Sequence, residues 1–159
     1  MKNKDRIAIS IDPNSRMPAF TTINLTTGKI TNYGKLNLHP LSAWEKLIIP
    51  NDVLVMEKQY LAKDTKANVR SLITLVKSVG FIEGLAHLHN IEVVEYMPST
   101  WQSKMLACGY KALRWERKKM SKLRASDELG IKINSDDISD SINLALYYYR
   151  MQKFNQQEE

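Results

Sequence analysis

Two runs of the sequence are apolar on both faces, the pattern of a strand buried in the middle of a sheet. In residues 6–12, isoleucine recurs at every second position, while the other face carries small residues and ends on Asp12. A second run, residues 52–57, is apolar from its second residue and ends on Glu57. Both predicted strands therefore finish with a carboxylate.

Three further segments have the composition and spacing of strands. They are residues 18–25, 30–38 and 91–96. The first two are joined by the sequence Thr-Thr-Gly-Lys, in which Gly28 suits a hairpin turn. Together with residues 6–12, they predict three antiparallel N-terminal strands in a five-stranded mixed sheet.

Other segments repeat apolar residues every three or four positions, as amphipathic helices do. The longest spans residues 66–89, where Gly80 and Gly84 share a face and would let a neighbour approach closely. Strands alternating with helices indicate an α/β fold, with helices flanking the mixed sheet. Shorter helices are predicted at residues 41–48, 98–106, 114–128 and 136–152.

Composition indicates a globular protein with an ordinary core. Of the 159 residues, 43% are hydrophobic and 25% are charged, which excludes a wholly disordered chain. We expect one domain over residues 1–152, followed by a frayed tail at 153–159. Cys108 is the only cysteine, which excludes an internal disulfide and a cysteine-based zinc cluster. No stretch approaches the length of a membrane span, so we expect no membrane partner.

Four carboxylates occupy positions from which they could converge. Asp12 and Glu57 end strands, and open α/β sheets form their sites beyond the carboxyl ends of strands. Asp137 and Asp140 lie three residues apart at the start of the last predicted helix, so they share a face. Taken singly, each acid is more often an ordinary strand end or helix cap. Together, the four acids could bind two hard cations through oxygen.

Three segments resemble the motifs of the RuvC family of Holliday junction resolvases, which have the RNase H-like fold. Residues 9–15 resemble the first motif, residues 55–60 the second and residues 137–146 the third. Each stands at the strand end or helix start that the family requires. Asn14 stands where the family usually has glycine. The resemblance runs in order over about residues 6–150 and indicates a minimal member of bacteriophage type.

The resemblance implies an endodeoxyribonuclease that hydrolyses DNA with two Mg²⁺ ions per active site, for which Mn²⁺ can substitute. Its catalytic, metal-binding acids would be Asp12, Glu57, Asp137 and Asp140. Its substrate would be the four-way junction and other branched DNA such as flaps or forks, cut by a homodimer. Tyr60 stands where the family inserts an aromatic residue near the junction centre. The location would be cytoplasmic, in the host cell if a phage encodes the chain.

The distribution of charge adds candidate DNA contacts. Lys and Arg outnumber Asp and Glu by 23 to 17, which favours polyanionic partners. Six of the basic residues fall within residues 114–124, where Glu116 is the only acid. Such a run is usually a solvated helix face, but beside a nuclease site it is a candidate for binding phosphates. The candidates in this run are Arg114, Arg117, Lys118, Lys119 and Lys122, and the resemblance to the family adds Lys104.

Two alternatives remain open. Another RNase H-like nuclease would act on RNA or on an RNA–DNA hybrid. A non-catalytic protein that binds branched DNA would be indicated if the four acids did not converge. The sequence has no Gly-x-Ser-x-Gly, dinucleotide-binding glycine or Cys-x-x-Cys pattern, which argues against acyl transfer and redox chemistry. If the protein is a dimer, we expect the helix at residues 66–89 to form the interface.

Overall fold

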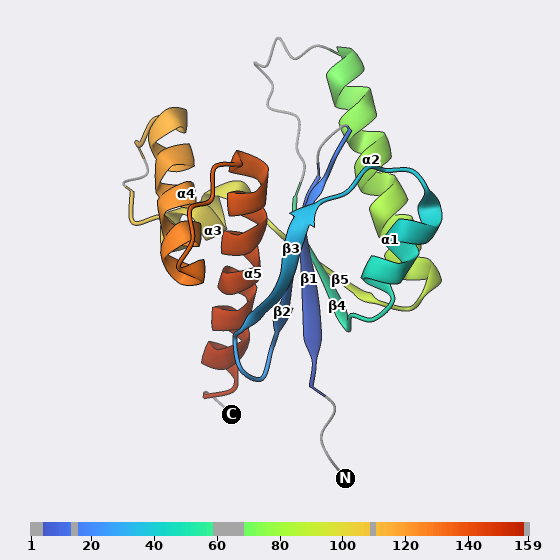
Figure 1. Ribbon diagram of the computed structural model, residues 1–159, viewed down its shortest axis with the longest axis horizontal. Helices are drawn as coiled ribbons and strands as arrows, with labels where there is room; N and C mark the ends of the chain where they lie inside the picture. Colours follow the sequence, from blue (N-terminus) through green and yellow to red (C-terminus); the bar gives the residue numbers. More distant parts are fainter. Residues whose placement is uncertain (1–4, 14–15, 59–68, 109–110, 158–159) are drawn as a thin grey trace.

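A computed structural model describes residues 5–13, 16–58, 69–108 and 111–157. In it, a five-stranded sheet stands between two layers of helices, as the α/β prediction required (Figure 1). The strand order across the sheet is β3-β2-β1-β4-β5. The strands are β1 (Ile7–Asp12), β2 (Ala19–Asn24), β3 (Ile30–Lys35), β4 (Val53–Glu57) and β5 (Glu92–Tyr96).

The strand directions bring four carboxyl ends to one edge of the sheet. β2 runs antiparallel to β1 and β3, whereas β4 is parallel to β1 and β5 is parallel to β4. All strands except β2 therefore end at the same edge. The predicted hairpin turn is present, with Gly28 at φ 76°, and a Cβ there would lie 2.6 Å from the ring of Tyr149. Glycine is thus required at this turn both by conformation and by space.

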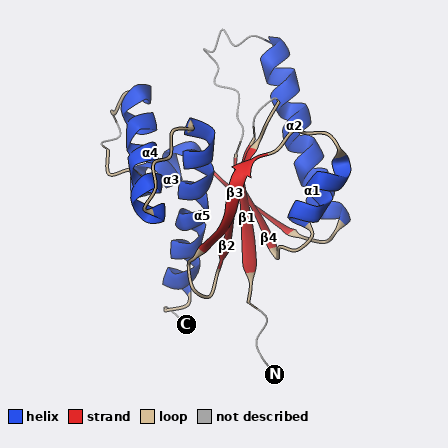
Figure 2. Ribbon diagram, viewed as in Figure 1, coloured by secondary structure: helices blue, strands red, loops and turns tan. Residues whose placement is uncertain are grey.

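The two helical layers cover opposite faces of the sheet (Figure 2). One layer holds α1 (Leu41–Ile48) and α2 (Val69–Leu88), and the other holds α3 (Pro98–Met105), α4 (Arg114–Leu129) and α5 (Asp136–Asn155). Helix α5 packs on β1 and β2, and α4 packs on α5. Residues 153–155, which we predicted as part of a frayed tail, continue α5. None of the helices within the described ranges is long and apolar enough to cross a membrane.

The alternation of side chains along β1 and β4 decides which face of the sheet each acid joins. Ile9 and Ile11 of β1 lie in the core beneath α1 and α2, whereas Ala8 lies in the core beneath α5. By the same alternation, Asp12 belongs to the α5 face. In β4, Val53 and Val55 lie on the α5 face, so Glu57 falls on that face as well.

Large aromatic side chains are divided between core and surface. Trp101, Tyr147 and Tyr148 are buried in the core on the α5 face of the sheet, the more common position for such side chains. Trp115 is 60% exposed on α4 and packs in neither core cluster.

Candidate active site

A pocket of about 340 Å³ lies beyond the carboxyl edge of the sheet, on the face that α5 covers. All four predicted acids line it, so the strand-end pair and the helix pair converge as the sequence predicts. Its other lining residues include three cations from α4. The charged lining residues are Asp12, Glu57, Asp137, Asp140, Arg114, Arg117 and Lys118.

Local structure explains why the acids meet. In the parallel pairing of β1 with β4, Ile11 stands opposite Met56, so Asp12 and Glu57, the next and last residues of the two strands, end the strands side by side. Helix α5 begins at the same edge, where the Ser135 side chain accepts a hydrogen bond from the backbone N–H of Ile138 at 3.4 Å. The first turns of α5 then carry Asp137 and Asp140 into the pocket.

The acids raise one another's affinity for protons. Burial raises the pKa of Asp12 well above its usual range, and the nearby charges of Asp140, Glu57 and Asp137 raise it further. Burial and then Asp140 raise the pKa of Glu57 to about 7, although a hydrogen bond from Trp101 and the charge of Lys118 oppose the shift. Positive charge in the pocket would counter both shifts, and bound cations would supply such charge.

Two lysines supply part of that positive charge. The Lys118 ammonium lies 2.5 Å from Oδ2 of Asp140, and Lys35, the last residue of β3, forms an ion pair with Asp137. Burial lowers the pKa of Lys118, but Asp140, Asp12 and Asp136 outweigh burial, so the net shift is upward. Lys118 is therefore charged at neutral pH and faces the acids.

Buried hydrogen bonds fix the direction of two carboxylates. Ser121 of α4 donates to Oδ1 of Asp140 at 2.6 Å, and the backbone carbonyl of Ser121 accepts from the amide of Asn143 at 2.9 Å. The indole N–H of Trp101 donates to Oε1 of Glu57 at 3.4 Å. These partners orient carboxylate oxygens in the way that outer groups orient ligands around a metal.

The donor set suits divalent cations. Carboxylate oxygens are the ligands that Mg²⁺ prefers, and four carboxylates line this one pocket. Within the described ranges, no three His, Cys, Asp or Glu side chains are placed to hold a metal ion. Two of the four acids form ion pairs with lysines, Asp137 with Lys35 and Asp140 with Lys118.

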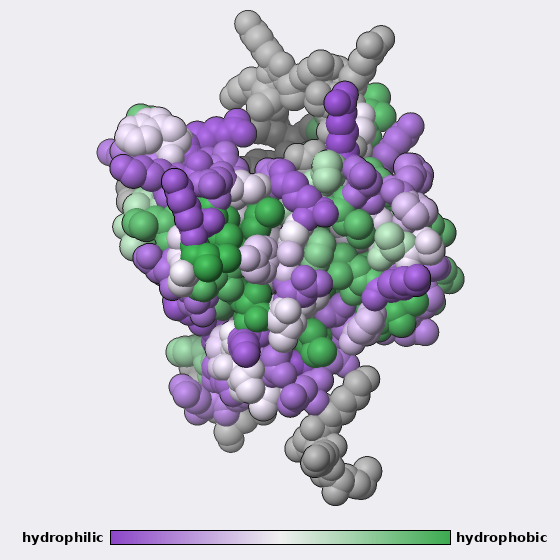
Figure 3. All heavy atoms as spheres, in the orientation of Figure 1, coloured by the Kyte–Doolittle hydropathy of each residue, from purple (hydrophilic) through white to green (hydrophobic). Residues whose placement is uncertain are grey.

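The other predicted DNA contacts lie in several places. Arg114 and Arg117 line the acid pocket, and hydrophilic side chains gather over the beginning of α4 (Figure 3). Lys119 and Lys122 instead line a separate pocket along α4, where Lys122 also pairs with Asp136 at 3.0 Å. Lys104 lies 6.0 Å from the ring centre of Tyr147, away from the acids. The DNA contacts of these lysines stay predictions.

Two predicted features lie outside the described residues. These are Tyr60 and Asn14. The predicted aromatic contact of Tyr60 with the junction centre therefore stays a prediction.

Sequence reasoning missed Lys35 and Ser121. Lys35 carries a partial signal, because it lies in the predicted strand 30–38, although the observed strand already ends at Lys35, at the same edge as Asp12. Ser121 carries none, since a serine within a basic helical segment is ordinary and only the packing of α4 on α5 places it against Asp140.

Comparisons with known proteins agree with this geometry. The family described as Poxvirus A22 protein matches residues 6–153 of the chain. No curated protein sequence matches it. Among solved structures, Thermus thermophilus RuvC in complex with a Holliday junction substrate is similar with a TM-score of 0.67 and 13% identity, over 92% of this chain and 96% of that one.

Two further solved structures are similar over most of the chain. A second Thermus thermophilus RuvC structure gives a TM-score of 0.64 at 15% identity, over 92% of this chain and 96% of that one. The yeast mitochondrial Holliday junction resolvase Ydc2 gives a TM-score of 0.58 at 15% identity, over 92% of this chain and 78% of that one. The RNase H-like arrangement of sheet and helices is thus shared.

Proposed function

The chain belongs to the poxvirus A22 protein family and is a RuvC-like Holliday junction resolving endonuclease, and we propose that its four pocket carboxylates hold the divalent cations with which it cuts DNA. The cations we propose are two Mg²⁺ ions per site. When bound, they supply activation of the attacking water and stabilisation of the leaving 3′ oxygen.

The position of each pocket residue suggests its role. Asp12 and Glu57, at the strand ends, and Asp137 and Asp140, on α5, would hold the cations. Arg114 and Arg117 line the same pocket and attract the phosphate that is to be cut. Lys118, which the acids keep charged, lines the same pocket and would add a positive charge for that phosphate.

The convergence of the four acids on one pocket is the observation that carries this proposal. A non-catalytic DNA-binding protein was the alternative if they did not converge. Four acids in one pocket would not help a protein without metal to bind DNA, because ionised carboxylates repel phosphate and protonated ones do not attract it. A metal-dependent nuclease accounts for them directly.

We also propose that the protein acts as a homodimer that pairs through α2. On that helix Ile73 and Val76 are 49% and 57% exposed, although both are apolar. Nothing lies within 4 Å of a Cβ built on Gly80 or Gly84, so a second helix could approach closely there. A two-fold dimer would present two acid pockets to two strands of one junction.

A panel of labelled DNA substrates tests the proposed function. Four-way junction, flap, fork, linear duplex and RNA–DNA hybrid are each incubated with the protein, with and without Mg²⁺. We expect Mg²⁺-dependent cleavage of the junction and little cleavage of the linear duplex. Preferential cleavage of the hybrid would instead support the RNA-directed alternative.

A further inference from the structure

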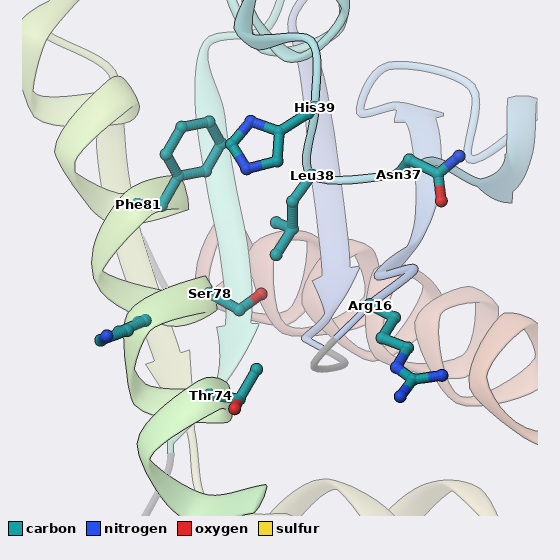
Figure 4. A pocket seen from close by; sticks show the side chains of 8 residues that line it. Arg16, Asn37, Leu38, His39, Thr74, Ser78 and Phe81 are labelled. Carbon is teal, nitrogen blue, oxygen red and sulfur yellow. The ribbon is translucent and has the colours of Figure 1, made fainter. Parts of the chain in front are cut away.

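A second pocket, of about 680 Å³, lies on the other face of the sheet from the acids (Figure 4). The loop that follows β3 and the helix α2 form its two sides, and Arg16 from the loop between β1 and β2 closes it. Its volume is in the range of pockets that bind small organic ligands.

The α2 side of this pocket is one continuous helix face. Thr74, Lys77, Ser78 and Phe81 have the spacing i, i+3, i+4 and i+7, which places them on one face. Phe81 is half-buried against the core beneath α1 and α2, and Ser78 is buried. The pocket thus has an aromatic wall with hydroxyl groups beside it.

The remaining lining residues add an apolar surface and positive charge. Leu38 is half-buried, whereas Asn37 and His39 are exposed on the loop after β3. Arg16 and Lys77 carry positive charge, and none of the lining residues that the structure describes is acidic. An apolar wall with a cationic rim suits a ligand that is flat and apolar at one end and anionic at the other.

Two chain connections join this pocket to the acid site. Arg16 follows Asp12 by four residues, so their Cα atoms are at most about 14 Å apart. Asn37 follows Lys35 by two residues, and Lys35 pairs with Asp137 in the acid pocket. A DNA strand that leaves the acid site could therefore reach the second pocket within a few nucleotides.

We propose that this pocket binds one unpaired nucleotide of the branched DNA. The base lies against Phe81 and Leu38, and the phosphate lies at Arg16 and Lys77. The inference rests on the proposed function, since it takes branched DNA as the substrate. It explains how the protein distinguishes a branch point from a duplex, because a paired and stacked base cannot enter a pocket.

Binding of a short single strand, without divalent metal, tests the pocket apart from cleavage. The probe is labelled pentathymidylate in buffer with EDTA, and its dissociation constant is measured by fluorescence anisotropy. Lys77→Gln should weaken binding about fivefold, and Phe81→Leu about tenfold, through loss of a phosphate contact and of stacking. Lys29→Gln, which removes an exposed charge from the β2–β3 turn, is the matched control and should change little. Equal effects of Lys77→Gln and Lys29→Gln would overturn the proposal.

A crosslink on the unaltered protein locates the nucleotide without any variant. The probe carries 5-iododeoxyuridine at an unpaired position, and mass spectrometry identifies the modified residue after irradiation. We expect modification of Phe81 or His39. Modification of Trp115 instead, which is exposed beside the basic residues of α4, would place the unpaired base elsewhere and refute the pocket.

These readouts separate the pocket from the nuclease activity. If the unaltered protein cleaves no junction, the proposed function fails, while binding of pentathymidylate still reports on the pocket. If cleavage is normal but Lys77→Gln behaves as Lys29→Gln does, the pocket alone fails.

Discussion

Ser121 donates a hydrogen bond from its hydroxyl to Oδ1 of Asp140 at 2.6 Å, in the buried contact between α4 and α5. Lys118, one turn earlier on α4, lies 2.5 Å from the other oxygen of the same carboxylate. Helix α4 thus holds both oxygens of one proposed metal ligand. Substitution of the serine and of the lysine should nevertheless have different effects on cleavage, because the serine orients the carboxylate without carrying a charge.

Ser121→Ala should weaken the response to Mg²⁺. Loss of the hydroxyl leaves Oδ1 of Asp140 without its orienting partner, and such losses cost about 10–100-fold in metal affinity or activity. Junction cleavage measured against Mg²⁺ concentration should therefore reach half-maximum at a higher concentration, with recovery at excess Mg²⁺. Ser103→Ala on the exposed surface of α3 is the control. A lower melting temperature with an unchanged Mg²⁺ midpoint would show that Ser121 is only structural.

Substitution of two neighbouring lysines on α4 should affect different properties, cleavage in one case and the salt dependence of DNA binding in the other. Lys118 faces Asp140 in the acid pocket, whereas Lys119 lines a different pocket. Lys118→Ala should slow junction cleavage at least about tenfold, as expected for loss of a charge beside the reacting phosphate. Lys119→Ala should mainly reduce the salt dependence of binding, by about one unit of slope if it contacts a phosphate. Slower cleavage by Lys119→Ala, together with normal cleavage by Lys118→Ala, would contradict the placement of Lys118 beside the acids.

The metal-free protein should lose stability as pH rises, because of Glu57. Its pKa is about 7 in the folded protein against 4.5 for an ordinary glutamate. The folded state therefore holds a proton that the unfolded state has released. The resulting stability is fully present below about pH 4.5 and is lost as pH rises through about 7.

Thermal unfolding in EDTA at pH 5.5 and pH 8 measures this effect. The melting temperature of the unaltered protein minus that of Glu57→Gln should be lower at pH 8 than at pH 5.5. Mg²⁺ should raise the melting temperature more at pH 8 than at pH 5.5. If this difference were higher at pH 8 than at pH 5.5, the pKa of Glu57 would not be raised in the folded protein.

Val76→Glu should produce a monomer if α2 forms the dimer interface. The side chain is apolar and 57% exposed, so a charge there costs little in an isolated chain but is buried in the proposed interface. Light scattering at micromolar concentration measures the mass. Leu123→Glu, at a side chain 50% exposed on α4, is the matched control and should leave the mass unchanged. A Val76→Glu protein with the mass of the unaltered dimer would place the interface elsewhere.

The fold and the acid pocket could be predicted because local patterns determine them. Alternation along β1 places Asp12 on a chosen face, and the parallel pairing with β4 then brings Glu57 beside it. The spacing of Asp137 and Asp140 fixes their common side of a helix wherever that helix packs. None of these inferences requires knowledge of a long-range contact between side chains.

The partners of the acids could not be predicted in this way. Lys35 and Asp137 are 102 residues apart, and their ion pair depends on how α5 packs over the sheet. The basic run on α4 looked uniform, yet the helix turns Lys118 towards the acids and Lys119 away from them. The end of α5 was placed at residue 152, before a tail expected to fray at 153–159, whereas the helix continues to Asn155.

Comparison of Asp12→Asn with the unaltered protein is the most direct test that the four carboxylates cut DNA with metal. Both proteins are given labelled four-way junction with Mg²⁺ for cleavage, and with Ca²⁺ for binding. The substitution keeps size and removes the charge, so the dissociation constant for the junction should stay within a few-fold. Cleavage should fall about a thousandfold or more, as for loss of a catalytic group. Full cleavage by Asp12→Asn would contradict the assignment of the acid pocket as the active site.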